Sequence, residues 1–201
     1  ILYRLVGSEM CIRDRSMIDK RSNESSHLKS DLQYYKSFME WGMDGEANAF
    51  LEEVLLWLSE NLPLSPNPKK LCWGDSRIGN VLFEDFQVKS LLDWEMATIG
   101  DPLCDLAWGL TTDDVSSYGL NIEKLPGSIA NEEAIKFWEK NTGFSAENFF
   151  YYRILCLFKF SVIMIRVAKK LIHNEIMPLD SDFHVNNHVS NYLRQEFNEK
   201  N

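Results

Sequence analysis

The spacing of hydrophobic residues predicts a mostly helical chain. In the clearest example, 46–62, an apolar side chain recurs every three or four positions, with glutamates at positions between them. This period places the apolar side chains on one face of a helix. Asn131 and Ser145 each precede a further predicted helix and are its expected N-cap. The other stretches expected to be helical are 31–41, a helix that begins at 100–102, 132–140, 146–173 and 182–197.

The stretch 146–173 is almost entirely apolar, which fits either a buried helix or a membrane span. Arg153, Lys159 and Arg166 interrupt it, so it lacks the run of about 18 uncharged residues that a membrane span requires. A buried core helix without membrane contact is therefore predicted. By contrast, the stretch 113–128 holds two glycines and a proline, and it predicts a loop.

Polar side chains stand at both ends of a predicted β-hairpin. Two short apolar runs, 80–83 and 88–92, flank a polar turn. Asp75 and Asn80 lie at the start of the first run, and Asp93 follows the second. Because a hairpin brings its two ends together, these three side chains are expected to converge. Two carboxylates and a carboxamide form an all-oxygen site, which suits Mg²⁺ rather than Zn²⁺.

The spacing of these residues is that of a kinase catalytic loop. Asp75 and Asn80 match the D-x-x-x-x-N pattern, in which the Asp is the base and the Asn is a Mg²⁺ ligand. A further metal-binding Asp follows the next hairpin in that chemistry, and Asp93 stands there. The alternative interpretation is an ordinary hairpin with acidic turns, which would not require these spacings.

Three motifs occur in order: Gly74-Asp75-x-x-x-x-Asn80, Asp93-Trp94-Glu95, and Gly-Asp-Pro-x-x-Asp-Leu-Ala at 100–107. Together they resemble the aminoglycoside phosphotransferase and choline kinase-like family. With Arg77 present, the chain looks most like kinase domains associated with acyl-CoA dehydrogenases. The resemblance implies an α+β, mostly helical fold: the C-terminal lobe of the protein-kinase-like fold with a small catalytic β-hairpin. The family usually has a His that holds the loop in shape two residues before the catalytic Asp, where this chain has Trp73.

The same resemblance implies an enzyme that transfers the γ-phosphoryl group of ATP to the hydroxyl group of a small molecule. Asp75 would be the catalytic base, and Arg77 would offset charge on the transferred group. Asn80 and Asp93 would hold Mg²⁺, and together with Glu95 they would form the cofactor-binding set for Mg²⁺ and ATP. These residues are chemically sufficient for the half of the active site that the C-terminal lobe supplies, because phosphoryl transfer depends chiefly on positioning and electrostatics.

Two acidic residues stand at the start of the helix predicted to begin at 100–102. The resemblance implies that Asp105 supports the site structurally, by accepting hydrogen bonds from the backbone of the catalytic loop. For Asp101, a role in the site and the general preference for acids at helix N-termini account for the residue equally well.

The segment before Leu71 shows neither a Gly-rich loop nor an apolar strand that carries Lys, although the nucleotide-covering lobe of a kinase needs both. Residues 16–201 are therefore expected to be a phosphotransferase C-terminal lobe with the N-terminal lobe absent. This fragment alone is expected to have no kinase activity. Residues 1–15 resemble a translated sequencing adapter and are expected to be non-native.

A non-catalytic kinase-like binding module, partnered with an acyl-CoA dehydrogenase, is the alternative function. The retained base and metal ligands argue against it, since a binding module needs neither, whereas Trp73 and the missing lobe favour it. For the enzyme, the acceptor alcohol is open among an aminoglycoside, a choline-like alcohol, a sugar and a hydroxyacyl thioester. The resemblance to dehydrogenase-associated kinases favours the last of these.

Composition narrows the partners further. The 201 residues are 45% hydrophobic and include six Trp, as in one globular domain. The net charge of −9 (21 − 30), without a basic block, argues against a nucleic-acid partner. Four widely separated cysteines indicate reduced thiols in a cytoplasmic protein. His184 and His188 have the i, i+4 spacing of a metal-binding pair, but without a third ligand they predict a polar helix face.

Overall fold

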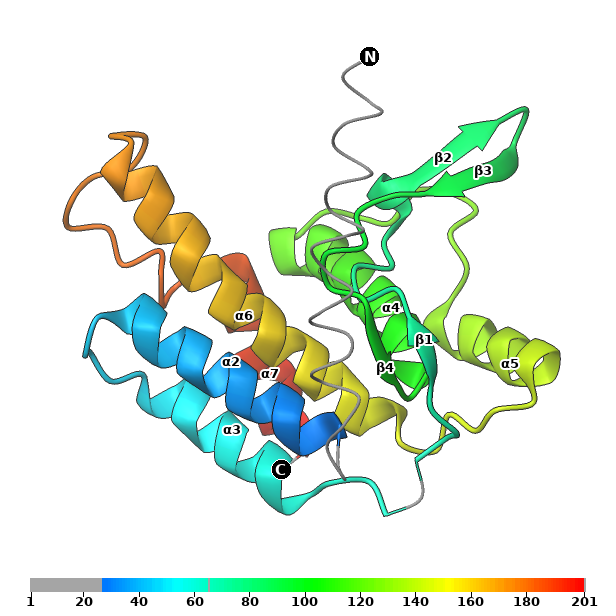
Figure 1. Cartoon of the computed structure of the whole chain (residues 1–201). Helices are drawn as coiled ribbons and strands as arrows, with labels where there is room; N and C mark the ends of the chain where they lie inside the picture. The colour runs from blue at the N-terminus through cyan, green and yellow to red at the C-terminus, as the bar shows by residue number, and fades with distance from the viewer. Residues whose placement is uncertain (1–26, 65, 201) are drawn as a thin grey trace.

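The computed structural model describes residues 27–64 and 66–200 (Figure 1). Residues 1–15, expected to be non-native, lie outside this described part of the chain. The described residues form a mostly helical α+β structure, as predicted. Its α-helices are α2 (His27–Met43), α3 (Ala49–Glu60), α4 (Leu103–Ser117), α5 (Asn131–Thr142), α6 (Phe149–His173) and α7 (His188–Lys200). Its strands are β1 (Lys70–Cys72), β2 (Val81–Glu84), β3 (Gln87–Leu91) and β4 (Thr98–Gly100), and two 3₁₀ turns are η1 (Ile78–Asn80) and η2 (Tyr118–Leu120).

Helix α6 forms the centre of the helical part of the molecule. It packs against α2, α3, α4 and α7, and Figure 1 shows it running alongside α2. The eight consecutive residues 151–158 are all buried, which requires neighbours on every face of the helix. The prediction of a buried core helix is therefore confirmed. In the described part of the chain, no helix has both the length and the apolar character needed to cross a bilayer.

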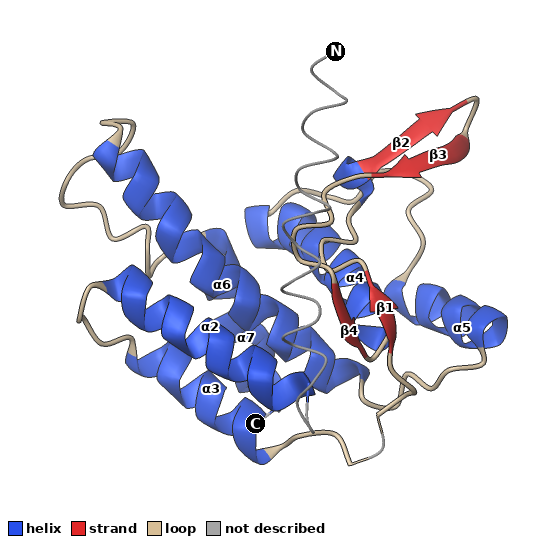
Figure 2. Cartoon of the chain, in the orientation of Figure 1, coloured by secondary structure: helices blue, strands red, loops and turns tan. Residues whose placement is uncertain are grey.

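Two small antiparallel sheets stand beside the helices (Figure 2). Strands β2 and β3 form the predicted hairpin. Its two-residue turn, Asp85 and Phe86, has positive φ at both positions (50° and 61°), as in a type I′ turn. The pairing of β1 with β4 was not predicted, because each strand has only three residues and Lys70 pairs with a residue 30 positions away (100 − 70).

Helix α4 is longer than the sequence pattern predicts. It continues to Ser117, so 113–117 is helical and the predicted loop begins later. Val115 is fully buried, and the Asp114 carboxylate lies 2.7 Å from an Arg153 guanidinium nitrogen on α6. Burial raises the pKa of Asp114, but hydrogen bonds from Lys124 and Arg153 outweigh burial and lower it overall. These contacts stabilise the last turn of α4, and the nearby glycines and proline conceal that turn in the sequence.

Helix α7 is shorter than predicted, because 182–187 forms turns and the helix begins at His188. The Asn187 side-chain oxygen accepts hydrogen bonds from the backbone N–H groups of residues 189 and 190 (3.0 and 3.1 Å), which fixes this start. His184 therefore does not share a helix face with His188. It lies 3.8 Å from the Glu46 carboxylate instead.

Other helix starts also differ from the prediction, and α3 begins at Ala49 rather than at 46. Helix α2 begins at His27 rather than at 31. The Asn131 side chain does not cap α5, because it donates a hydrogen bond to Asp114 (2.7 Å). The Ser145 hydroxyl accepts a weak hydrogen bond from the backbone of residue 147 (3.2 Å), but α6 begins only at Phe149. Asn131 and Ser145 thus do not cap the helices for which they were predicted, because each side chain makes a different hydrogen bond.

Candidate active site

The loop that carries Asp75 depends on a glycine. Gly74 has φ +91°, and a Cβ atom at this position would lie 2.2 Å from the Met96 carbonyl oxygen. That separation is far below van der Waals contact with a backbone atom, so a side chain here would displace the loop. The sequence therefore needs Gly74 for the chain to turn from β1 into the Asp75 segment.

Helix α4 anchors this loop through Asp105. Asp105 accepts hydrogen bonds from the backbone N–H groups of Trp73 (2.7 Å) and Gly74 (2.8 Å), the arrangement that the family resemblance implied for it. Burial raises the pKa of Asp105, and the two backbone hydrogen bonds partly offset that rise. Ser76 adds a hydrogen bond from its hydroxyl to the Asp105 carbonyl oxygen (2.6 Å). One turn of α4 thus fixes both sides of Asp75.

Gly109 lets α4 approach the loop closely. A Cβ atom on Gly109 would lie 2.8 Å from the Ser76 carbonyl oxygen. The sequence pattern gave no reason to select this glycine, because a helical glycine carries no signal of what packs against it.

Both carboxylate oxygens of Asp75 are hydrogen-bonded. Its Oδ2 accepts from Asn80 Nδ2 (2.6 Å) and from Arg77 Nε (3.0 Å). Its Oδ1 accepts from the indole nitrogen of Trp108 (2.7 Å). The Asp75 side chain is 13% exposed and that of Arg77 is 51% exposed, so the carboxylate lies at the edge of the protein with Arg77 on its solvent side. Three of these residues were predicted for the site, and Trp108 was not.

Asn80 and Asp93 are linked through the ends of the hairpin. Asn80 is buried at the end of η1, and its carbonyl oxygen accepts a hydrogen bond from the backbone N–H of Leu92 (2.8 Å), the residue before Asp93. Asp93 itself has φ +58°, a strained backbone conformation for an aspartate. The structure thus brings Asp75 into direct contact with Asn80, and ties Asn80 to the residue next to Asp93.

The oxygens of this pair fit a magnesium ion. Asp93 Oδ1 is buried and has no hydrogen-bond partner among the described residues, although a buried carboxylate oxygen ordinarily requires one. The side-chain nitrogen of Asn80 donates hydrogen bonds to Asp75, and no hydrogen bond among the described residues involves the Asn80 side-chain oxygen. The described residues contain no group of three His, Cys, Asp or Glu suited to a metal. Mg²⁺ needs no such group, because it is commonly held by one or two protein oxygens together with nucleotide phosphates and water.

Trp73 occupies the position where the family has His. Its indole nitrogen donates a hydrogen bond to the Leu92 carbonyl oxygen (2.7 Å), and its ring packs against Trp94 at a centroid distance of 6.0 Å. The indole thus supplies a ring N–H donor that holds the segment leading to Asp93. Glu95, the weakest predicted member of the cofactor-binding set, is exposed at the surface two residues beyond Asp93.

Asp101 has a structural role at the start of α4. Its carboxylate accepts hydrogen bonds from the backbone N–H of Leu103 (2.9 Å), from the Asn67 side chain (3.0 Å) and from the Tyr152 hydroxyl (3.0 Å). These contacts join the helix start to the segment before β1 and to α6. The alternatives that the sequence left open for Asp101 are thus resolved in favour of a helix-terminal structural residue.

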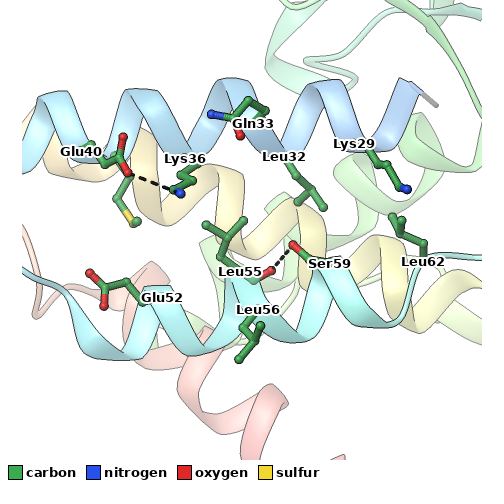
Figure 3. A pocket seen from close by; sticks show the side chains of 11 residues that line it. Lys29, Leu32, Gln33, Lys36, Glu40, Glu52, Leu55, Leu56, Ser59 and Leu62 are labelled. Carbon is green, nitrogen blue, oxygen red and sulfur yellow. Dashed lines mark hydrogen bonds and ion pairs between the residues drawn. The ribbon is translucent and has the colours of Figure 1, made fainter. Parts of the chain in front are cut away.

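A groove of about 650 Å³ lies between α2 and α3, apart from these residues (Figure 3). Leu32 of α2 and Leu55 of α3 line it, with Lys36 and Glu52 among its charged residues. None of the predicted site residues lines this groove. The candidate site is therefore defined by the hydrogen bonds of Asp75 and by the Oδ1 of Asp93, which is unpaired among the described residues, and not by the volume of a groove.

Comparison with known proteins identifies a family of enzymes. The model of the phosphotransferase enzyme family matches residues 16–138. Acyl-CoA dehydrogenase family member 11 of Pongo abelii is 32% identical over 124 residues, which are 56% of this chain and 16% of that protein. Its Gallus gallus counterpart is 33% identical over 138 residues, which are 62% of this chain and 18% of that protein. The chain therefore spans less than a fifth of the length of these relatives.

A solved structure supports the fold. A crystal structure from Ralstonia eutropha, described as that of an aminoglycoside phosphotransferase, matches with a TM-score of 0.65 at 16% sequence identity. The match covers 84% of this chain and 52% of that chain. The predicted family resemblance and fold class are confirmed.

Proposed function

The chain belongs to the phosphotransferase enzyme family, and we propose that it forms the catalytic lobe of a kinase that transfers the γ-phosphoryl group of ATP to the hydroxyl group of a small molecule. One observation carries this proposal. The Asp75 carboxylate is held by three donors, of which Asn80 is one, and the hairpin ends tie Asn80 to the segment of Asp93, whose buried Oδ1 has no partner among the described residues. A base next to two oxygen ligands for Mg²⁺ is the arrangement that phosphoryl transfer to an alcohol requires.

Each residue has a specific task in this mechanism. Asp75 orients the acceptor hydroxyl and takes its proton at the carboxylate. Asn80 and Asp93 hold Mg²⁺ through their free side-chain oxygens, and bound Mg²⁺ supplies charge neutralisation on the phosphates. Arg77 bonds Asp75 through Nε, which leaves its terminal guanidinium nitrogens able to face the transferred phosphoryl group. Exposed Glu95 supports the metal from the rim.

The hairpin supports a site that is completed by a further lobe. Strand β3 is exposed along its whole length, and β2 is exposed except at the half-buried Val81. We propose that the nucleotide-covering lobe packs on this apolar surface and encloses the ATP. The exposed apolar residues of this region are Leu82, Phe83, Phe86, Val88, Leu91 and Leu92.

The relatives suggest the acceptor and its partner. The relatives described above carry the name of an acyl-CoA dehydrogenase, and a hydroxyacyl thioester is a hydroxyl substrate that such an enzyme's chemistry would place nearby. We therefore propose a hydroxyacyl thioester as the acceptor and association with an acyl-CoA dehydrogenase. A cytoplasmic location accords with the free thiols of Cys72, Cys104 and Cys156. The net negative charge of the chain supports the absence of a nucleic-acid partner.

The test uses the full-length protein that contains this chain. The protein is incubated with γ-labelled ATP, Mg²⁺ and one acceptor at a time. The acceptors are a hydroxyacyl-CoA, choline, a hexose and an aminoglycoside. We expect labelled product from the hydroxyacyl-CoA, formed about 10²-fold or more slowly by the Asp75→Asn variant. A folded full-length protein that neither labels any of these acceptors nor hydrolyses ATP would contradict the kinase and favour a non-catalytic binding module.

A further inference from the structure

The described residues place one more side chain on the candidate base. Trp108 lies in the second turn of α4 and is 4% exposed. Its indole nitrogen donates to Asp75 Oδ1 at 2.7 Å. The two other donors to Asp75, Arg77 and Asn80, belong to the same loop as Asp75 itself. Trp108 is therefore the donor that joins the Asp75 carboxylate to the helical core.

The ring of Trp108 is held in place by its surroundings. It packs against Phe160 of α6 at a centroid distance of 5.9 Å. The buried Lys159 ammonium lies 5.9 Å from the centre of the same ring, and Lys159 pairs with Asp31 of α2 (3.1 Å). Burial alone would lower the pKa of Lys159, but the charge of Asp31 raises it overall, so this cation persists beside the ring. The Trp108 ring is thus held by two contacts with α6, and α2 holds one of them, Lys159, through Asp31.

The chemistry of an indole suits a positioning task. An indole nitrogen is a donor only, so it can bind the carboxylate but cannot accept a proton from it. Its bond occupies Oδ1 on the buried side. Oδ2 accepts from the half-exposed Arg77 and from the buried Asn80, so both oxygens of the carboxylate are held. A carboxylate held at both oxygens has lost its rotation about χ2, and a base that is fixed in orientation contributes more to catalysis than one that rotates.

From these contacts we infer that Trp108 is a positioning residue for Asp75. It fixes the orientation in which the Asp75 carboxylate meets the acceptor hydroxyl. This inference rests on the proposed function for its catalytic meaning, and on the structure alone for its geometry. Trp108 does not touch the reacting atoms, so its effect on turnover passes entirely through Asp75.

The geometric part can be tested on the chain itself. The six Trp indole N–H groups give resolved signals in a ¹H–¹⁵N spectrum, and the Trp108→Phe variant identifies the signal of Trp108. In Asp75→Ala, the Trp108 indole proton should move upfield and exchange with solvent about tenfold faster or more, because a bond to a charged acceptor is lost. The Trp73 indole, which donates to a backbone carbonyl, is the internal control and should change little. An unchanged Trp108 signal would overturn the inference.

The catalytic part is tested in the full-length protein. Trp108→Phe removes the donor but keeps an aromatic ring, and we expect kcat to fall about tenfold with Mg·ATP affinity unchanged. Trp57→Phe, which alters a core indole packed on Phe150 and Tyr151, is the matched control and should leave kcat unchanged.

A double-mutant cycle separates positioning from general damage. In an Asp75→Asn background, Trp108→Phe should cost nothing further if it acts through Asp75. An equal loss in both backgrounds, or weaker Mg·ATP binding, would overturn the inference. A wild-type protein without phosphoryl transfer would refute the proposed function instead, and the indole spectrum would then decide the geometric claim independently.

Discussion

Helix α6 and the β2–β3 hairpin are both rich in apolar residues, yet the protein buries one and exposes the other. In α6, residues 151–158 are all buried between neighbouring helices. In the hairpin, every residue of β3 is exposed. The difference shows that apolar character serves two purposes here. In α6 it stabilises the fold, whereas in the hairpin it leaves an exposed surface, on which we propose that the nucleotide-covering lobe packs.

The candidate site lies between the hairpin and α4, a helix that packs against α6. The hairpin contributes Asn80 and Asp93 at its two ends, and α4, which packs against α6, contributes Asp105 and Trp108. The hairpin therefore acts on the site by joining its ends, and the helices act by holding the loop of Asp75. Stability and chemistry are expected to respond to different substitutions.

The largest expected effect contrasts the two regions directly. Leu155→Ala in α6 removes a side chain that is 1% exposed and should lower the free energy of unfolding by about 2–5 kcal/mol. Val88→Ala in β3 removes one that is 59% exposed and should change it by about 0.5 kcal/mol or less. Urea denaturation of each variant of this chain measures both. Similar losses at the two positions would show that the hairpin is packed as tightly as the core.

Next in size are the catalytic residues in the full-length protein. Asp75→Asn and Asp93→Asn should each lower kcat by about 10²-fold or more, the scale of a positioned base or electrostatic contact. Glu84→Gln, at the exposed end of the same hairpin, should leave kcat unchanged. Steady-state kinetics with the labelled acceptor measure all three. If Glu84→Gln were as damaging as the aspartate variants, general disturbance of the hairpin would explain the losses.

A smaller effect tests the observed start of α7. Asn187→Ala removes the oxygen that accepts two backbone hydrogen bonds, and should cost about 0.5–2 kcal/mol of stability. Asn186→Ala changes an exposed neighbour whose side chain bonds, among the described residues, only to the side chains of Asp182 and Asn191, and should cost less. Thermal unfolding of the two variants gives the comparison. Equal costs would favour the earlier helix start that the sequence pattern predicts.

The smallest effect concerns pH. Burial lowers the pKa of His188 below its ordinary value of 6.5. The unfolded chain therefore binds a proton more readily than the folded one, and stability should be lost as pH falls from about 6.5 towards the lower folded pKa. The His188→Gln variant should lose less stability than the wild type between pH 7 and pH 5. Denaturation at a series of pH values measures this, and identical pH profiles would contradict it.

Patterns that depend on neighbours in the sequence predicted the structure well. The period of α3, the burial of α6 and the β2–β3 turn are all local, and the spacing of Asp75, Asn80 and Asp93 is set by a single hairpin. The β1–β4 sheet was missed because it joins two three-residue strands across the whole motif region. Helix α4 was ended too early because contacts with Arg153 outweigh the nearby loop residues.

The part of the site that escaped prediction is the part made by tertiary contacts. Trp108 directly follows the last residue of the third motif, and its bond to Asp75 spans 33 residues of sequence. An apolar, helical position gave no sign that its one polar atom would meet the base. Trp73 was recognised only as a departure from the family, whereas its bond to the Leu92 carbonyl shows that an indole can supply the ring donor there.

The central claim is that Asp75 is the base and that Asp93, with Asn80, holds Mg²⁺. Calorimetric titration of Mg·ATP into the full-length Asp75→Asn and Asp93→Asn variants tests it most directly. Asp75→Asn should bind Mg·ATP nearly as tightly as the wild type, because the base does not contact the nucleotide. Asp93→Asn should weaken the Mg²⁺-dependent binding, because it removes a charged residue that would hold the ion. Weakened binding in Asp75→Asn together with intact binding in Asp93→Asn would contradict the assignment.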